Sequence, residues 1–174
     1  MIALTHAPHD LVVGTSDGID VRFAGVEFKD APGFVGVSAG EPGIHVHLSG
    51  VRGKETMSRD GRFNRGLEEW WKRREAAGSD RSENPPPMPG VAVFEGITTV
   101  VSDDIGTEYR RSGGQTAGSG MEWDALWVYT PAPPAEARTL RLEFSVGGEL
   151  TGKYCEFSLS DPISADGLAN HAPH

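Results

Sequence analysis

Apolar and polar residues alternate along several stretches of this chain, which is the period-two pattern of strands that bury one face. The alternation is clearest from Thr139 to Val146, and it recurs over Ile19–Phe23 and Ile44–Leu48. From Gly96 to Leu159 it forms one continuous series of strand-like segments and turns. The 23 glycines and 12 prolines supply turn residues for such a chain. The pattern predicts an all-β fold, an antiparallel β-sandwich.

Three local departures from this alternation carry further predictions. After Gly25 the apolar phase shifts from Phe23 to Val26, which predicts a β-bulge at the glycine. The glycine-rich stretch from Gly113 to Gly120 predicts a flexible hairpin loop. The apolar run from Val91 to Phe94 predicts a return to strand.

Residues 50–90 do not follow the strand pattern. Gly50 to Gly66 is polar and without periodicity, so it predicts a long loop. Leu67 to Ala77 places apolar residues at helical spacing and predicts one short helix. The proline-rich stretch 79–89 predicts a stiff linker. We therefore expect an inserted segment between two halves of the sandwich.

The length of 174 residues fits a single domain, expected over residues 1–159 and followed by a flexible tail over 160–174. Cys155 is the one cysteine, which excludes a disulfide within the chain and suits a reducing compartment. Met1 to Asp10 shows no secretion signal, and no stretch is apolar enough to span a membrane. These features predict a cytoplasmic protein that does not bind membranes.

Charge is distributed unevenly along the chain. The formal net charge is −9, which does not favour nucleic acid as a partner. Between Arg52 and Arg81, however, nine basic and six acidic residues give a net charge of +3, which leaves −12 on the remainder. The insertion is therefore basic and the predicted sandwich is acidic.

The predicted helix carries the residue types that dominate protein interfaces. Trp70, Trp71, Arg73 and Arg74 lie together on it, and tryptophan and arginine are enriched at binding hot spots. Adjacent tryptophans cannot point the same way, so one indole is expected to dock on the sandwich while the other lies nearer the surface. These four residues are the candidate partner-binding site. The alternative is a helix that only covers a sheet edge.

His45 and His47 are the candidate metal ligands. With Ile44, Val46 and Leu48 facing the core, both imidazoles are expected on the opposite, exposed face, where they lie close enough to share a metal ion. No third ligand follows at the expected spacing. Two solvated histidines without a metal are the alternative, and no other cofactor is predicted.

The remaining features have structural explanations. Trp123, Trp127 and Tyr129 share one face of a predicted strand and are expected in the core, although exposed rings there would suit a carbohydrate. Asp103-Asp104 predicts a turn, with a calcium site as the alternative. Gly36 to Gly40 matches the G-x-S-x-G nucleophile pattern, but no helix follows it.

A set of residues toward the C-terminal end matches a known kind of domain: Asp103 to Tyr109, Gly113-Gly114, Trp123, Trp127, Pro131 and Pro133-Pro134. In these residues the chain resembles uncharacterised immunoglobulin-like β-sandwich domains of high-GC Gram-positive bacteria. The resemblance covers well under half of the chain. It implies an immunoglobulin-like or jelly-roll-type sandwich and a bacterial setting, and it brings no catalytic residues.

The sequence therefore predicts a non-catalytic interaction or scaffolding domain that binds a protein partner or itself. Two alternatives from other classes stay open. One is a metal-dependent enzyme that uses His45 and His47, and the other is a carbohydrate-binding sandwich.

Overall fold

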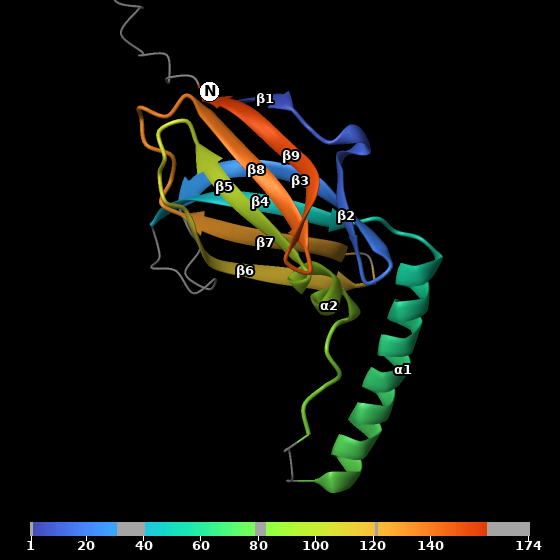
Figure 1. Cartoon of the computed structure of the whole chain (residues 1–174). Coiled ribbons are helices and arrows are strands. Elements are labelled where there is room, and N and C mark those ends of the chain that lie inside the picture. The colour runs from blue at the N-terminus through green and yellow to red at the C-terminus, as the bar shows by residue number, and fades with distance from the viewer. Residues whose placement is uncertain (1, 31–40, 79–82, 121, 160–174) are drawn as a thin grey trace, which may run out of the picture.

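Two antiparallel sheets packed face to face form the body of the protein in a computed structural model, which describes residues 2–30, 41–78, 83–120 and 122–159 (Figure 1). The four-stranded sheet has the order β1 (Ile2–His6), β9 (Glu149–Leu159), β8 (Thr139–Val146), β5 (Ile97–Asp103). The five-stranded sheet has the order β2 (Val12–Ser16), β3 (Ile19–Asp30), β4 (Pro42–Gly50), β7 (Glu122–Thr130), β6 (Arg110–Ser119). The predicted all-β antiparallel sandwich is confirmed.

The core lies between the two sheets and collects the alternating apolar residues of both. Leu140, Leu142 and Phe144 from β8 are fully buried against side chains of the five-stranded sheet. Trp123 and Trp127 from β7 are 2% exposed and belong to the same cluster, so their predicted core position is confirmed.

The predicted bulge in β3 is present. The register between β3 and β4 shifts between Phe23 and Gly25, and Gly25 has a φ of 147° that favours glycine. Because of this shift, Phe23 and Val26 both face the interior although they are three positions apart. The bulge bends β3 at the point where it faces β1 across a pocket.

The predicted glycine loop is wrong, because Gly113 to Ser119 belongs to strand β6 and pairs with β7. The glycines provide space there. A Cβ built on Gly114 would lie 2.3 Å from the Trp127 ring, and one on Gly118 would lie 2.4 Å from the Cα of Gly90. The strand therefore needs glycine for close packing.

The predicted strand at Val91–Phe94 is also wrong. These residues form helix α2 (Pro89–Glu95), which begins with proline at its first turn. Val93 and Phe94 are fully buried, so α2 closes one end of the sandwich (Figure 1). A short apolar run fits a buried strand and a buried helix equally well, which explains the error.

The insertion contains one long helix where a loop followed by a short helix was predicted. Helix α1 (Lys54–Ala77) has 24 residues and extends away from the sandwich, and the segment 83–88 returns beside it to α2 (Figure 1). We call α1 and this return segment the arm. The prediction of a loop over Gly50–Gly66 failed because that half of α1 is mostly polar, and its two large apolar residues, Met57 and Phe63, do not form a helical apolar stripe.

Two predictions concern residues outside the described ranges: the G-x-S-x-G match at Gly36–Gly40 and the tail 160–174.

Candidate functional site

Polar contacts attach the first turns of α1 to the sandwich. The Arg59 guanidinium donates to the side chain and the backbone carbonyl of Asp17 in the β2–β3 turn, and to Glu55 at 2.9 Å. The Asp60 carboxylate accepts the backbone N–H of Gly120 at 2.9 Å and the indole N–H of Trp123 at 3.3 Å. Since Asp60 is only 9% exposed, these bonds are shielded from water and fix the direction in which the arm leaves the sandwich.

Farther along, the return segment packs against α1. The indole N–H of Trp70 donates to the backbone carbonyl of Glu83 at 3.0 Å, and Trp70 is 4% exposed. The Glu83 carboxylate accepts two hydrogen bonds from Arg73, at 2.8 and 3.2 Å. A Cβ built on Gly66 would lie 3.9 Å from Pro86, at ordinary contact distance, so the return segment passes close to the helix at this position. The arm thus consists of a helix and a return segment that stabilise each other.

Trp71 is the exposed aromatic residue of the arm. Trp71 is 51% exposed, and its ring centroid lies 4.6 Å from that of Trp70 in an edge-on arrangement. The Arg74 guanidinium lies over both indoles, at 5.0 Å from Trp70 and 5.6 Å from Trp71. The cation therefore holds both rings in place.

The four predicted partner-binding residues thus divide into two pairs. Trp70 and Arg73 are engaged by Glu83 within the arm, whereas Trp71 is exposed and Arg74 lies over both indoles. One indole is buried and the other is exposed, as expected. The buried indole, however, bonds the return segment and not a strand of the sandwich. Nothing in the local sequence around Trp70 identifies Glu83 as its partner.

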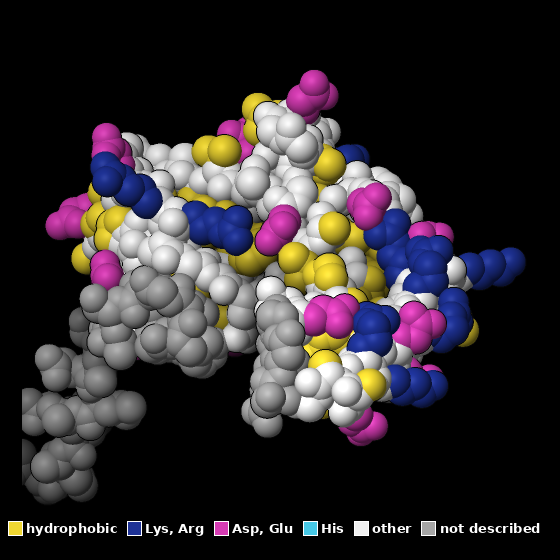
Figure 2. Space-filling model, turned by 90° about the horizontal axis from the view of Figure 1, so that it is seen from below, with side chains coloured by type: hydrophobic (Ala, Val, Ile, Leu, Met, Phe, Trp, Pro, Cys, Tyr) yellow, Lys and Arg dark blue, Asp and Glu magenta, His cyan; other side chains and the backbone are white. Residues whose placement is uncertain are grey.

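Charged side chains of both signs surround these residues. On the side of the molecule where α1 lies, Lys and Arg side chains are interspersed with Asp and Glu side chains (Figure 2). The distal half of α1 contributes Lys72, Arg73 and Arg74, but also Glu68, Glu69 and Glu75. The excess of positive charge therefore lies in the first half of the helix, where an acidic partner surface would complement it.

His45 and His47 occupy different environments. His45 is fully buried, and neither of its ring nitrogens has a partner at ordinary hydrogen-bond geometry among the described residues. His47 has a side chain that is 36% exposed, with Nε2 3.4 Å from the Glu27 carboxylate. The expectation that both imidazoles are exposed is therefore wrong for His45.

Burial lowers the pKa of His45, and the positive charges of Lys29 and His47 act in the same direction, while Glu27 opposes them. This imidazole is consequently neutral near pH 7. Within the described ranges, no group of three or more His, Cys, Asp and Glu side chains lies close enough together to hold a metal ion. The binding of a metal ion by His45 and His47 stays a prediction.

Asp103 makes the turn contacts that were predicted, whereas Asp104 contacts a distant segment of the chain. Asp103 accepts the backbone N–H groups of Ile105 and Thr107 and the hydroxyl of Tyr109, at 2.8–3.1 Å. Burial alone would raise the pKa of Asp103, but these hydrogen bonds outweigh it and lower the pKa to about 2. Asp104 accepts two backbone N–H groups at the start of β8. Both carboxylates are committed to structure.

Cys155 is an inert thiol. It is fully buried in β9, and burial raises its pKa to about 12. A thiolate is the reactive form, so Cys155 is not a nucleophile at neutral pH.

Sequence reasoning missed a hollow between β1 and β3. Its rim includes Ile2 and Leu4, in a strand that no prediction placed. The alternation of Ile2, Leu4 and His6 was the available signal, but five residues are too few to distinguish a strand from a loose end.

Comparisons of the chain with protein-family models, with curated proteins and with solved structures find no match. Among the described residues, neither helix combines the length and apolar character that crossing a membrane requires.

Proposed function

We propose that this protein is a non-catalytic interaction domain that associates with a second copy of itself through the distal part of the arm. One observation carries the proposal: a tryptophan that is 51% exposed, Trp71, is held under the Arg74 guanidinium on a helix directed away from the body. An aromatic ring and an arginine fixed together are the usual centre of a binding hot spot.

Charge supports a second copy as the partner. The segment from Arg52 to Arg81 carries +3 and the rest of the chain −12, so the sandwich of another copy offers the opposite charge. The arm of one chain leads away from its own sandwich (Figure 1). If two copies are related by a two-fold axis, the arm of each contacts the sandwich of the other. The same contact then forms twice, and the assembly closes as a dimer.

Rigidity of the arm also supports binding. Glu83 holds both Trp70 and Arg73, so the segment that carries Trp71 is already ordered before a partner arrives. Ordering flexible side chains on binding costs affinity, and a pre-ordered surface avoids much of that cost.

Sedimentation velocity over a range of protein concentrations tests the proposal. We expect a monomer–dimer equilibrium that weakens between about 0.05 M and 0.5 M salt, since screening reduces the attraction between the basic arm and the acidic sandwich. Trp71→Ala should weaken dimerisation by roughly 30-fold or more, the effect of losing a hot spot worth about 2 kcal/mol. Arg74→Glu should weaken it as well.

Met57→Ala is the matched control, because Met57 is 67% exposed on the same helix but lies near the sandwich, away from the distal surface. It should leave the dimer intact. A monomer at every concentration and salt, or equal effects of Trp71→Ala and Met57→Ala, would contradict self-association through the arm.

We also infer that the sandwich is related to immunoglobulin-like domains and that the protein works in a bacterial cytoplasm. The resemblance around Asp103 to Pro134 supports the relationship, and a single cysteine suits the compartment. Fractionation of the source cells tests the location: recovery in the culture medium would contradict it.

A further inference from the structure

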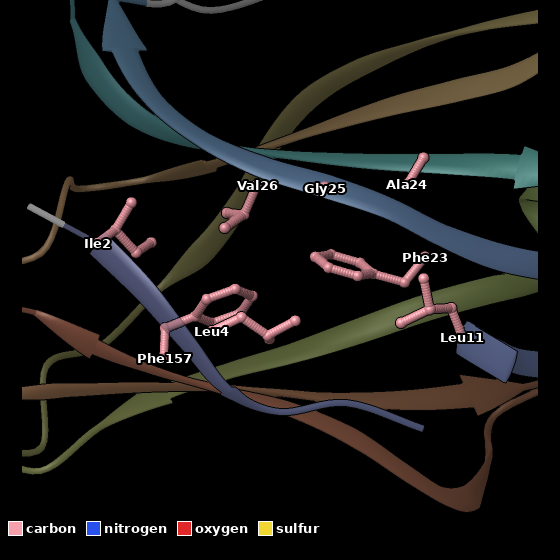
Figure 3. A pocket seen from close by; sticks show the side chains of 8 residues that line it. All are labelled: Ile2, Leu4, Leu11, Phe23, Ala24, Gly25, Val26 and Phe157. Carbon is pink, nitrogen blue, oxygen red and sulfur yellow. The ribbon is translucent and has the colours of Figure 1, made fainter. Parts of the chain in front are cut away.

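A hollow of about 280 Å³ lies between the two sheets at the side where β1 faces β3 (Figure 3). β1 contributes Ile2 and Leu4, β9 contributes Phe157, and the short 3₁₀ turn His9–Leu11 contributes Leu11. The opposite side is the bulged part of β3, from Phe23 to Val26. The side chains of Leu4, Phe23 and Phe157 project into the space between the two strands, whereas that of Ala24 points away from it (Figure 3).

Irregularities in both strands open this space. In β3 the bulge places Gly25 beside the hollow, and a Cβ built on Gly25 would meet nothing within 4 Å. In β1 the register with β9 shifts between Leu4 and His6. The two sheets therefore do not interdigitate here as they do under β8.

The residues that line the hollow determine which kind of molecule can bind there. All eight lining residues are apolar, so the site offers no side chain to a charge or a hydrogen-bonding group. Phe23 and Phe157 form its floor, with 5% and 4% exposure and ring centroids 5.9 Å apart, while Leu4 at the rim is 50% exposed. The recess has a buried aromatic floor and an open rim, so a narrow apolar group can reach the two rings.

We propose that this hollow binds a single unbranched alkyl chain of an uncharged medium-chain aliphatic molecule, which enters past Leu4 and ends against Phe23 and Phe157. A methylene group takes up about as much space as a water molecule, roughly 30 Å³. The hollow therefore holds on the order of nine methylenes.

Titration of the isotope-labelled full chain with 1-hexanol, 1-octanol and 1-decanol, followed by NMR, tests the proposal. Methyl and aromatic signals of Leu4, Leu11, Phe23 and Phe157 should shift together and give one dissociation constant. Because each buried methylene strengthens binding by about fourfold, the dissociation constant should fall roughly fifteen-fold from 1-hexanol to 1-octanol, and by less from 1-octanol to 1-decanol, whose ten carbons exceed what the hollow holds. An unchanged dissociation constant along the series would overturn the proposal.

Substitutions at the rim separate the site from other exposed apolar residues. Leu4→Trp fills the entrance and Leu4→Asp places a charge in it, so each should weaken octanol binding at least tenfold. Leu150→Trp and Leu150→Asp are the matched controls, because Leu150 is 64% exposed in the β8–β9 hairpin and does not line the hollow. Two different variants at Leu4 keep the test valid if one of them fails to fold.

Three outcomes would contradict the proposal. Shifts of the Trp71 and Leu150 signals by octanol that are as large as those of Leu4 would indicate unspecific adsorption. Leu4 variants that bind octanol like the parent protein would exclude the hollow. If sedimentation showed that octanol dissociates a dimer formed through β1, a second copy of the chain would be the occupant of the hollow. Trp71→Ala should leave octanol binding unchanged, so this inference and self-association through the arm succeed or fail separately.

Discussion

In the sandwich, side chains from two sheets fill a common interior, whereas in the arm most side chains of α1 face solvent. Leu140, Leu142 and Phe144 are completely buried within three alternate positions of one strand. Of the 24 residues of α1, three are buried, and two of these are the polar Thr56 and Asp60. The sandwich is therefore stabilised by apolar burial, and the arm depends on a few directed polar contacts.

This difference predicts different kinds of failure. Loss of a core side chain affects the packing of both sheets, so it lowers the free energy of unfolding of the whole domain. Loss of a polar anchor releases one element and leaves the rest folded, because elements with few buried contacts open locally at lower free energy. Substitutions of decreasing severity test this division.

The largest effect is expected for Phe94→Ala in the sandwich. Phe94 is fully buried where α2 closes the end of the core, so its removal should lower the free energy of unfolding by about 3–5 kcal/mol. Urea denaturation followed by circular dichroism measures this. Met88→Ala, at a residue that is 38% exposed beside α2, should change it by about 0.5 kcal/mol or less. Equal effects would show that α2 is not part of the core.

A smaller and more local effect is expected for Asp60→Ala at the foot of the arm. The substitution leaves the Gly120 N–H and the Trp123 indole N–H without their acceptor, which costs about 1–3 kcal/mol. Hydrogen exchange should accelerate along α1 while the amides of β8 stay protected.

Asp60→Asn keeps one oxygen acceptor and should have a weaker effect than Asp60→Ala. Glu68→Ala, at an exposed position of the same helix, is the control and should leave exchange along α1 unchanged. Uniform acceleration in the sheets and in α1 would mean that the arm and the sandwich unfold as one unit.

The same division explains which elements were predictable from the sequence. Strands β7 and β8 and the bulge at Gly25 follow from alternation, because in a two-layer sandwich burial directly produces a period of two. The first half of α1 leaves no such trace, since its anchors Arg59 and Asp60 are polar residues whose partners lie far away in the chain. Polar tertiary contacts have no periodicity.

Glycine in β6 was misread for a related reason. A cluster of glycines suggests flexibility, but Gly114 and Gly118 are needed for the approach of Trp127 and Gly90, which come from other elements. In the candidate site, the exposure of one of two adjacent indoles followed from helical geometry. The role of Arg73 depends on Glu83, which lies ten positions farther along the chain and which no local pattern identifies as its partner.

Acid should weaken the sandwich through His45 by a smaller amount than loss of the Asp60 anchor. Burial lowers the pKa of this imidazole in the folded state, so the unfolded chain takes up a proton first as the pH falls below about 6.5. The contribution of neutral His45 to the free energy of unfolding should therefore be complete above that pH, and the free energy of unfolding should decrease toward pH 5. His45→Leu should flatten this part of the profile, measured by urea denaturation at several pH values.

His9→Gln is the control for that profile, because the His9 side chain is 91% exposed and contacts only its neighbour Asp10 among the ion pairs of the described residues. It should retain the loss of stability in acid. If His45→Leu kept the full decrease between pH 7 and pH 5, another group of the sandwich would have to cause it.

The smallest effect is expected for Glu83→Gln in the arm. The ion pair between Glu83 and Arg73 is exposed to solvent on both sides, so screening leaves it little influence on global stability. The bond from Trp70 ends on the backbone carbonyl of Glu83, which the substitution does not remove. We therefore expect an unchanged urea midpoint and an indole N–H of Trp70 that exchanges as slowly as in the parent chain. Faster exchange of that proton alone would show that the ion pair, and not the buried indole, holds the return segment against α1.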